Sequence, residues 1–324
     1  MSLSDFLKEW NNSADTVLVH TSGSTGTPKT LLVEKRRMLA SARMTCDFLN
    51  LQTGQTALLC MSLEYIGAKM MVVRAIERNL RLIEVEPTGH PLANVTTDID
   101  FAAMVPLQVY NSLQVPDERQ KLMNIKHLII GGGAIDKKMQ EELRSFPNAV
   151  WSTYGMTETL SHIALRRISG PKATDWYTPL AGVKIGLTEN NCLTISAPHL
   201  TPNTLITNDI AELNSTGGFR ILGRADNVIN SGGVKIQIEE VERMLLDYGI
   251  DNVAVSCCTD EKFGEAVVLL NASTVSDSTL NQAISQLPKY WQPKNIINVA
   301  TIPLTENGKI ARQKVKDLIA KRLN

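Results

Sequence analysis

Short, mostly apolar runs alternate with longer amphipathic stretches along the first half of the chain. The short runs predict strands, and they lie at 17–19, 57–61, 82–85 and 127–130. The longer stretches have helical periodicity and predict helices at 31–49, 66–79 and 136–146. Strands and helices in alternation predict an α/β fold with a mostly parallel sheet covered by helices.

The pattern changes twice in the second half. Short strands and turn residues between 182 and 222 predict a β-rich subdomain. Beyond Gly223 the pattern predicts a small α+β domain. Its elements are a helix at 238–247, a hairpin pair at 253–256 and 266–270, and a terminal helix from Arg312. We therefore expect a large domain over 1–222 and a small one over 223–324.

Composition narrows the classes of partner. Lys+Arg and Asp+Glu balance at 33 each, so net charge predicts no nucleic-acid partner. The chain has no apolar run of bilayer length, which predicts no membrane insertion. Asp5 and Glu9 near the N-terminus argue against a signal peptide. The five cysteines show no CxxC spacing, so we expect reduced thiols in a cytoplasmic protein rather than a zinc site or disulfides. The oligomeric state is left open.

A polar, glycine-containing loop follows the first predicted strand. Glycine lets several backbone N–H groups point at one anion, while hydroxyls add donors and lysine adds charge. The loop therefore predicts a polyphosphate site, with a plain flexible turn as the alternative. Pro28 stands where a Walker A loop needs glycine, so P-loop NTPase chemistry is not expected. The phosphate-binding candidates are Thr21, Ser22, Gly23, Ser24, Thr25, Gly26 and Lys29.

This loop resembles the phosphate loop of the adenylate-forming superfamily, which comprises acyl-CoA synthetases, luciferases and peptide-synthetase adenylation domains. Three further segments resemble that family's motifs in the same order. They are TYGMTET at 153–159, GRADNVI at 223–229 continuing to GGVKI at 232–236, and PLTENGKI at 303–310. Four ordered motifs spread over nearly the whole chain carry the resemblance.

The resemblance implies an AMP-forming acid–CoA ligase that uses ATP, Mg²⁺ and CoA. It implies that Lys309 contacts the acyl carboxylate and the α-phosphate during adenylation, whereas a solvated surface lysine is the alternative. Thr157 is expected to hydrogen-bond the α-phosphate. Glu158 is the expected magnesium ligand, since that cation prefers carboxylate and phosphate oxygens.

The family's nucleotide site implies further candidates. Tyr154 offers a flat face to adenine, and Asp209 and Arg224 are expected to hold the ribose. The glycine-rich segment after the strand at 127–130 is expected to line the other side of the adenine, with a plain strand-to-helix turn as the alternative. That segment is Gly131, Gly132, Gly133 and Ala134.

In relatives the small domain rotates between the two half-reactions. By resemblance, Asp226 lies at the hinge of that rotation. Gly232 and Gly233 are expected to face the CoA thiol in the second half-reaction. Typical members also carry a subdomain ahead of the phosphate loop, whereas only Met1–Asp15 precede it here, so we expect that first subdomain to be largely absent.

Two sequence segments indicate which acid is activated. The segments TETLSHIALR and EYIGAKMMVVRA are similar to those of short bacterial o-succinylbenzoate–CoA ligases of menaquinone synthesis. The candidate acyl-binding residues are Tyr65, Lys69 and His162. Lys69 is equally explained as a surface charge on a helix, and His162 as a hydrogen-bonded core histidine. Another aryl or acyl carboxylate, and a non-catalytic nucleotide-binding remnant, are the alternative functions.

Overall fold

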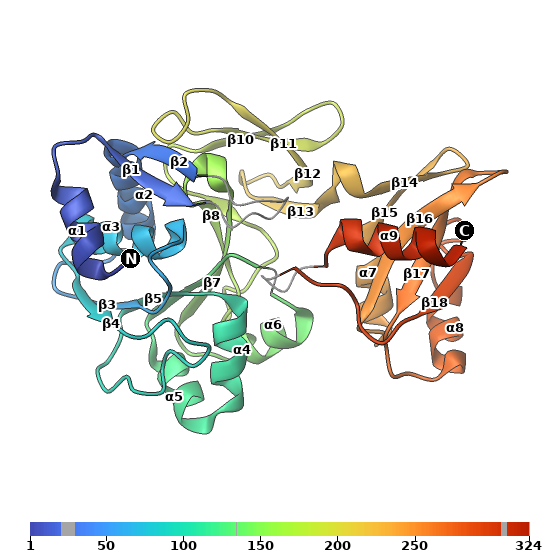
Figure 1. Cartoon of the computed structure of the whole chain (residues 1–324), viewed down its shortest axis with the longest axis horizontal. Helices are drawn as coiled ribbons and strands as arrows, with labels where there is room; N and C mark the ends of the chain where they lie inside the picture. Colours follow the sequence, from blue (N-terminus) through green and yellow to red (C-terminus); the bar gives the residue numbers. More distant parts are fainter. Residues whose placement is uncertain (21–29, 134, 306–309, 324) are drawn as a thin grey trace. The chain divides into compact units, whose positions relative to one another are not determined.

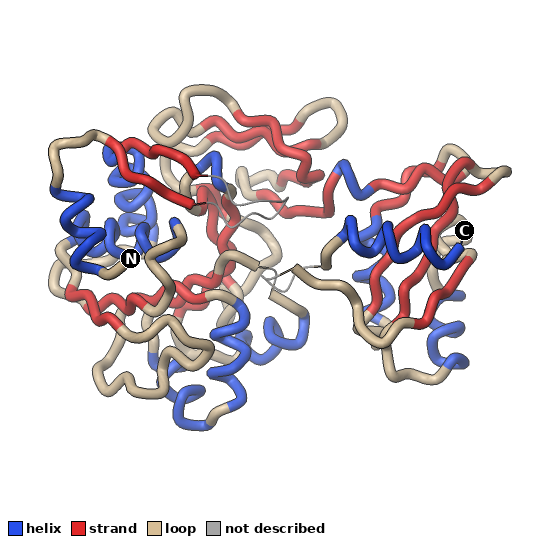
Figure 2. Tube along the Cα trace, in the orientation of Figure 1, coloured by secondary structure: helices blue, strands red, loops and turns tan. Residues whose placement is uncertain are grey.

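A computed structural model of the chain describes residues 1–20, 30–133, 135–305 and 310–323. It divides into two compact units. The first comprises Met1–Gly186, Thr194–Leu205 and Leu213–Arg220, and the second comprises Leu187–Leu193, Ile206–Glu212 and the chain from Ile221 onward. Figure 2 shows that both units mix helices with strands. The predicted limits of the mobile small domain, 223–324, stay a prediction.

The first unit is built on a sheet with the strand order β4-β3-β5-β6-β7-β8-β9 (Figure 1). Its strands from β4 to β7 are parallel, and β8 and β9 are antiparallel additions at one edge. Their bounds are β3 Thr56–Leu59, β4 Arg81–Glu84, β5 Phe101–Met104, β6 His127–Ile130, β7 Ala149–Gly155, β8 His162–Arg167 and β9 Thr178–Pro179. The predicted mostly parallel α/β fold is thus confirmed.

Helices cover both faces of this sheet. Alternate residues of one strand point to opposite faces, and both faces here are apolar. In β5, Phe101 and Ala103 join one core cluster while Ala102 and Met104 join the other. The first face is covered by α1 Leu3–Asn11, α2 Lys35–Phe48 and α3 Ile66–Arg78, and the second by α4 Pro106–Gln114, α5 Pro116–Asn124 and α6 Lys137–Arg144.

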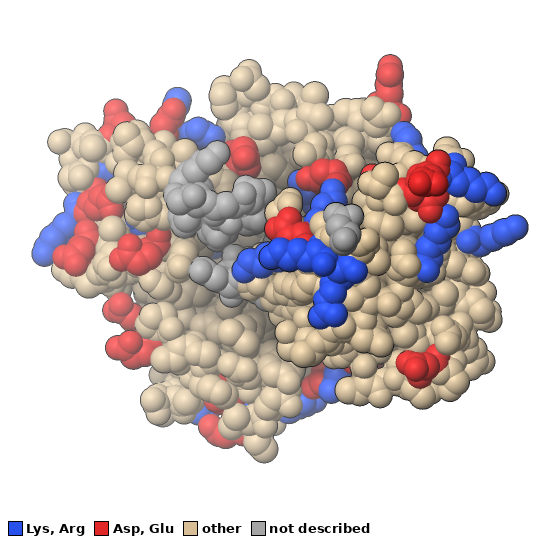
Figure 3. Space-filling model, turned by 45° about the vertical axis from the view of Figure 1, so that its right-hand side comes forward, with Lys and Arg blue, Asp and Glu red and all other residues tan. Residues whose placement is uncertain are grey.

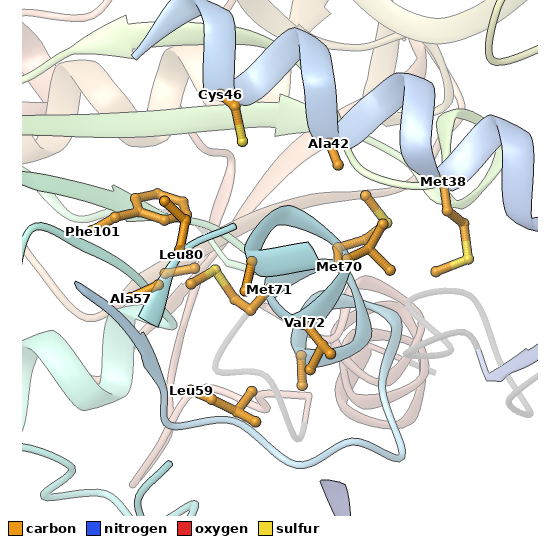
Figure 4. Close-up of a cluster of buried hydrophobic side chains, with 14 of the residues drawn as sticks. Met38, Ala42, Cys46, Ala57, Leu59, Met70, Met71, Val72, Leu80 and Phe101 are labelled. Carbon is orange, nitrogen blue, oxygen red and sulfur yellow. The ribbon is translucent and has the colours of Figure 1, made fainter. Parts of the chain in front are cut away.

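Helices α2 and α3 pack against each other through small and flexible side chains. Figure 4 shows Met38, Ala42 and Cys46, spaced four residues apart along α2, pointing toward Met70 and Met71 of α3. Residues at this spacing share one helix face. Burial of that face fixes α3, whose remaining polar residues are considered below.

A two-stranded hairpin corrects one prediction. The helix expected over 31–49 begins only at Lys35, because Thr30–Glu34 forms β2 and pairs antiparallel with β1 Thr16–His20. The strand expected at 17–19 is confirmed, but Leu18 faces outward between the buried Val17 and Val19.

The β-rich region predicted over 182–222 forms a sheet with the order β10-β11-β12-β13. Its strands are β10 Lys184–Leu187, β11 Cys192–Ser196, β12 Leu205–Leu213 and β13 Phe219–Arg224. A further sheet in the second unit has the order β15-β14-β17-β16, and β18 pairs with β17. Its strands are β14 Val228–Ser231, β15 Val234–Gln237, β16 Val253–Asp260, β17 Gly264–Asn271 and β18 Asn295–Asn298.

The second unit's sheet is also apolar on both faces. In β17, Val267 and Leu269 pack with α7 Ile238–Asp247 and α8 Asp277–Ser285, whereas Val268 and Leu270 pack with α9 Arg312–Leu323. The predicted helix at 238–247, the hairpin and the terminal helix from Arg312 are therefore confirmed. Among the described residues, no helix has the length and apolar character needed to cross a bilayer.

Candidate active site

The segment Tyr154–Glu158 leaves the sheet at the carboxyl end of β7. Gly155 is required there, because a Cβ at this position would lie 2.4 Å from the carbonyl oxygen of Ser161 and 2.5 Å from Cα of His162. The pairing of β7 with β8 is irregular at the same point, where Gly155 lies opposite His162. This close crossing brings Gly155, beside the candidate nucleotide residue Tyr154, next to Ser161 and the acyl candidate His162.

Tyr154 lies in an aromatic cluster. Its ring meets that of Phe219 edge-on at 5.1 Å between centroids and lies 5.8 Å from that of Tyr177. Tyr177 and Phe219 are stacked at 5.5 Å. The neighbours hold the half-buried Tyr154 ring at the end of the sheet, where ligands of open α/β folds bind. Its contact with adenine stays a prediction.

Thr157 and Glu158 belong to a single 3-10 turn, Thr157–Thr159. The Glu158 side chain is exposed, and within the described part of the chain it takes part in no ion pair. A carboxylate without a competing cation suits a magnesium ion that takes its other ligands from phosphate and water. The described residues hold no group of three potential metal ligands, so a magnesium ion bound here would depend on such ligands.

The glycine segment lies beside the end of β7. Gly131 follows β6 directly, and a Cβ on it would approach Thr153 Oγ1 to 2.5 Å. Gly132 has φ +80°, a left-handed conformation that favours glycine. Since β6 and β7 are neighbouring parallel strands, Gly131, Gly132 and Gly133 meet the Tyr154 turn at one edge of the sheet.

The second unit contains a compact acid–arginine cluster. Arg224 Nη1 lies 3.3 Å from Asp209 Oδ1, and its Nε and Nη2 each donate to Asp226 at 2.9 Å. These donated bonds hold the pKa of Asp226 below its ordinary value. The structure thus brings together the two expected ribose residues and the expected hinge residue, although their roles stay predictions.

Gly232 and Gly233 form the two-residue turn between β14 and β15. Their φ angles are +58° and +83°, which is the pattern of a tight hairpin turn. A role facing CoA stays a prediction. Several expected residues lie outside the described residues, namely Thr21, Ser22, Gly23, Ser24, Thr25, Gly26, Lys29, Ala134 and Lys309.

The acyl candidates Tyr65 and Lys69 differ in environment. Tyr65 precedes α3 and is half exposed. Lys69 is buried, so its interpretation as a surface charge is wrong. Its Nζ donates to the carbonyl oxygen of Leu18 at 2.5 Å and lies 5.6 Å from the centre of the Phe6 ring. Burial lowers the pKa of Lys69.

His162, the third acyl candidate, is buried and hydrogen-bonded. Its Nε2 lies 2.9 Å from Thr45 Oγ1, and its Nδ1 lies 3.5 Å from Ser161 Oγ. Burial, together with the nearby charge of Arg74, lowers the pKa of His162 well below its ordinary value. The ring is therefore neutral at physiological pH.

Arg74 is a residue that the sequence interpretation missed. Its side chain on α3 is 2% exposed, and Nη2 donates to Ser161 Oγ at 2.8 Å. Nη1 approaches Met71 Sδ at 3.8 Å, and Nε has no hydrogen-bond partner among the described residues. Burial lowers the pKa of Arg74 to about 10, so it remains protonated at neutral pH. Within the described residues no carboxylate forms an ion pair with it.

A buried cation without an anion is unusual, because buried charges are normally paired. The signal in the sequence was one arginine inside the apolar run MMVVRAI at 70–76. On the face drawn in Figure 3, by contrast, Lys and Arg side chains lie among Asp and Glu side chains. The Arg74 environment therefore differs from that of the surface cations.

Comparisons with known proteins bear on this site. The family model "AMP-binding enzyme" matches residues 6–194. The 2-succinylbenzoate–CoA ligase of Escherichia coli K12 is 25% identical, over 93% of this chain and 68% of that protein. Its Bacillus cereus (strain ATCC 10987) counterpart is 23% identical, over 93% and 70%.

Solved structures agree on the fold. The acyl-CoA synthetase (AMP-forming)/AMP-acid ligase II-like protein of Dyadobacter fermentans is 33% identical, covers 97% of this chain and 93% of its own, and has a TM-score of 0.68. E. coli MenE with a bound analogue of OSB-AMS is 22% identical, over 94% and 69%, with a TM-score of 0.75, and supports the fold alone. The chain thus belongs to the family of AMP-binding enzymes, as an AMP-forming acid–CoA ligase.

Proposed function

We propose that this ligase activates o-succinylbenzoate, or an acid of the same kind, to its CoA thioester. The observation that carries the proposal is the buried guanidinium of Arg74, with which no carboxylate of the described residues forms an ion pair. An acid with two carboxylates presents one to ATP and keeps one that must be satisfied inside the protein. A guanidinium binds such a carboxylate through two parallel N–H donors.

The surroundings of Arg74 suit that role. Arg74 donates to the hydroxyl of Ser161, which lies just beyond the turn Thr157–Thr159 that carries the proposed phosphate-side residues. His162 is neutral, so Arg74 rather than His162 would provide the positive charge for the second carboxylate of the acid. Names of the curated relatives, which are 2-succinylbenzoate–CoA ligases, support the same substrate.

The first half-reaction joins the second, reactive carboxylate to the α-phosphate of ATP. A carboxylate oxygen attacks phosphorus, and pyrophosphate leaves with its electron pair. Because two anions must approach each other, donors and cations lower the barrier. We assign this role to Lys309, Thr157 and the phosphate loop, with Glu158 holding a magnesium ion that neutralises phosphate charge.

In the second half-reaction, the CoA thiolate attacks the acyl carbonyl and AMP leaves. We assign Asp209 and Arg224 to the nucleotide's ribose through both steps. Gly232 and Gly233 are proposed to face the thiol after rotation at Asp226. The thioester and AMP are the products.

The test is a panel of acids under one set of conditions. Purified protein is mixed with ATP, magnesium and CoA, and both pyrophosphate release and the CoA thioester are measured for o-succinylbenzoate, benzoate and octanoate. We expect kcat/KM to be highest for o-succinylbenzoate, by about a hundredfold or more, because the other acids leave Arg74 unpaired. A higher kcat/KM for octanoate or benzoate would refute the substrate while leaving the ligase chemistry intact.

A further inference from the structure

A buried polar network connects Arg74 to helix α2 through Ser161 and through His162 of β8. Thr45 of α2 is fully buried, and its hydroxyl lies 2.9 Å from His162 Nε2 and 3.2 Å from the carbonyl oxygen of Ser41. Ser161 Oγ lies 3.5 Å from His162 Nδ1 on the other side of the ring. A chain of contacts therefore runs from α2 through the imidazole to Ser161 and Arg74.

Only one arrangement of hydrogens makes every contact of this network a hydrogen bond. A threonine hydroxyl has a single hydrogen, and the Ser41 carbonyl oxygen can only accept it. Thr45 Oγ1 then accepts from Nε2–H, which makes Nδ1 of the neutral ring an acceptor. Ser161 Oγ accepts from Arg74 Nη2 and has its own hydrogen directed to Nδ1. The position of the Thr45 hydroxyl thus decides which way each donor points.

Packing alone does not explain a threonine at this position. Its helix neighbours Ala42 and Cys46 belong to the apolar cluster between α2 and α3. A valine has nearly the same shape and would fill the space, but it would leave the buried Nε2–H without an acceptor. The role of the hydroxyl is therefore to accept a hydrogen bond from the imidazole rather than to fill the core.

We propose that Thr45 is a positioning residue for acid recognition: through His162 and Ser161 it fixes the orientation in which Arg74 meets the second carboxylate of the acid. This inference rests on the proposed function of Arg74. Thr45 itself touches no substrate. Its effect is on the preference between a dicarboxylate and a monocarboxylate, since only the dicarboxylate uses the guanidinium.

The test compares Thr45→Val, which removes the hydroxyl, with Thr45→Ser, which keeps it. Ser41→Ala is the matched control on the same helix. Within the described residues the Ser41 hydroxyl has no hydrogen-bond partner, and the substitution keeps the Ser41 carbonyl that Thr45 contacts. For each variant, kcat/KM is measured with o-succinylbenzoate and with benzoate. We expect Thr45→Val to lower the ratio of the two about tenfold, and Thr45→Ser and Ser41→Ala to change it less than about twofold.

A spectroscopic measurement distinguishes a change in the orientation of His162 from a general loss of folding. In ¹⁵N-labelled protein, the His162 signals are identified by their loss in His162→Gln. We expect native protein and Thr45→Ser to show a protonated Nε2 and a bare Nδ1, and Thr45→Val to show a mixture of tautomers. This readout needs no substrate.

Two results overturn the inference. One is an unchanged selectivity ratio in Thr45→Val, and the other is a loss in Thr45→Ser as large as in Thr45→Val. If Thr45→Val does not fold, the Thr45→Ser comparison and the native tautomer still decide, since a protonated Nδ1 contradicts the arrangement. Arg74→Met, measured in parallel, tests the proposed function separately. If it keeps the native ratio, the proposed function of Arg74 fails and the Thr45 inference fails with it. If it lowers the ratio while Thr45→Val does not, only the Thr45 inference fails.

Discussion

Replacing Arg74 by methionine should change stability and activity in opposite directions. Arg74 is 2% exposed, its Nε has no hydrogen-bond partner in the part of the chain that the structure describes, and burial lowers its pKa to about 10. Its charge is therefore unfavourable in the ligand-free protein. Replacing buried charged groups with apolar residues of similar volume is neutral or stabilising by roughly 1–4 kcal/mol. A gain of about 2 kcal/mol corresponds to a rise in Tm of about 4–8 °C for a unit of this size.

The same variant should lose activity toward a dicarboxylic acid. Truncating one member of a buried charge pair costs about 2–5 kcal/mol, which is a loss in kcat/KM of about thirtyfold or more. Activity toward benzoate, which offers no second carboxylate, should change much less. The selectivity of the ligase should therefore fall while the melting temperature rises.

Thermal unfolding followed by circular dichroism, and thioester formation with both acids, measure the two effects. Arg78→Met is the matched control on the same helix, since Arg78 is partly exposed and pairs with Asp47. A surface pair of this kind contributes about 0–1 kcal/mol, so this variant should alter neither property strongly. A lowered Tm for Arg74→Met, or an unchanged preference for the dicarboxylate, would refute the reasoning.

Four further outcomes are expected. Because the pKa of His162 is lowered in the folded protein, the free energy of unfolding should fall as the pH drops below about 6.5, by up to about 1.4 kcal/mol per pH unit. Urea unfolding at two pH values should show a smaller fall in His162→Gln than in the native protein. Arg312→Met should destabilise the second unit by about 1.5–3 kcal/mol in urea unfolding, because it leaves the partly buried Glu242 without its two bonds to Arg312 of 2.6 and 2.7 Å. Glu158→Gln should weaken the dependence of turnover on magnesium without lowering Tm, and an unchanged magnesium titration would remove Glu158 from the site. Lys309→Ala should abolish adenylation but spare thioester formation from preformed acyl-adenylate, and an equal loss in both would contradict its assigned role.

The main elements of the fold were predictable because each has a regular period. The strand at 127–130 and the helix at 238–247 were predicted with their observed bounds. Residues 30–34 were not, because the apolar run Leu31–Val33 suits either a helix or a strand, and pairing with β1 decides between them. Helices α4 and α5 were missed although Pro106 and Pro116 mark their first turns.

The candidate site was predictable only where a motif is local. Gly131 follows β6 and Tyr154 lies near the end of β7, and their proximity comes from the parallel pairing of these two neighbouring strands. Lys69 and Arg74 lie on one helix, and only Arg74 stands inside an apolar run that signals its burial. Lys69 is enclosed by Phe6 and Leu18, distant residues that only the folded chain brings to it.

The close crossing at Gly155 has a consequence for protein engineering. Between Gly155 and Ala164 the β7–β8 pairing passes over Ile163, so Tyr154 lies opposite Ala164 while Gly155 lies opposite His162. A one-residue deletion there would turn the following side chains to the opposite face of the sheet. Chimaeras with relatives should therefore exchange residues 153–165 as one segment. A junction inside this segment would combine two strands whose registers do not match, and the chimaera would not keep the acid preference of either parent.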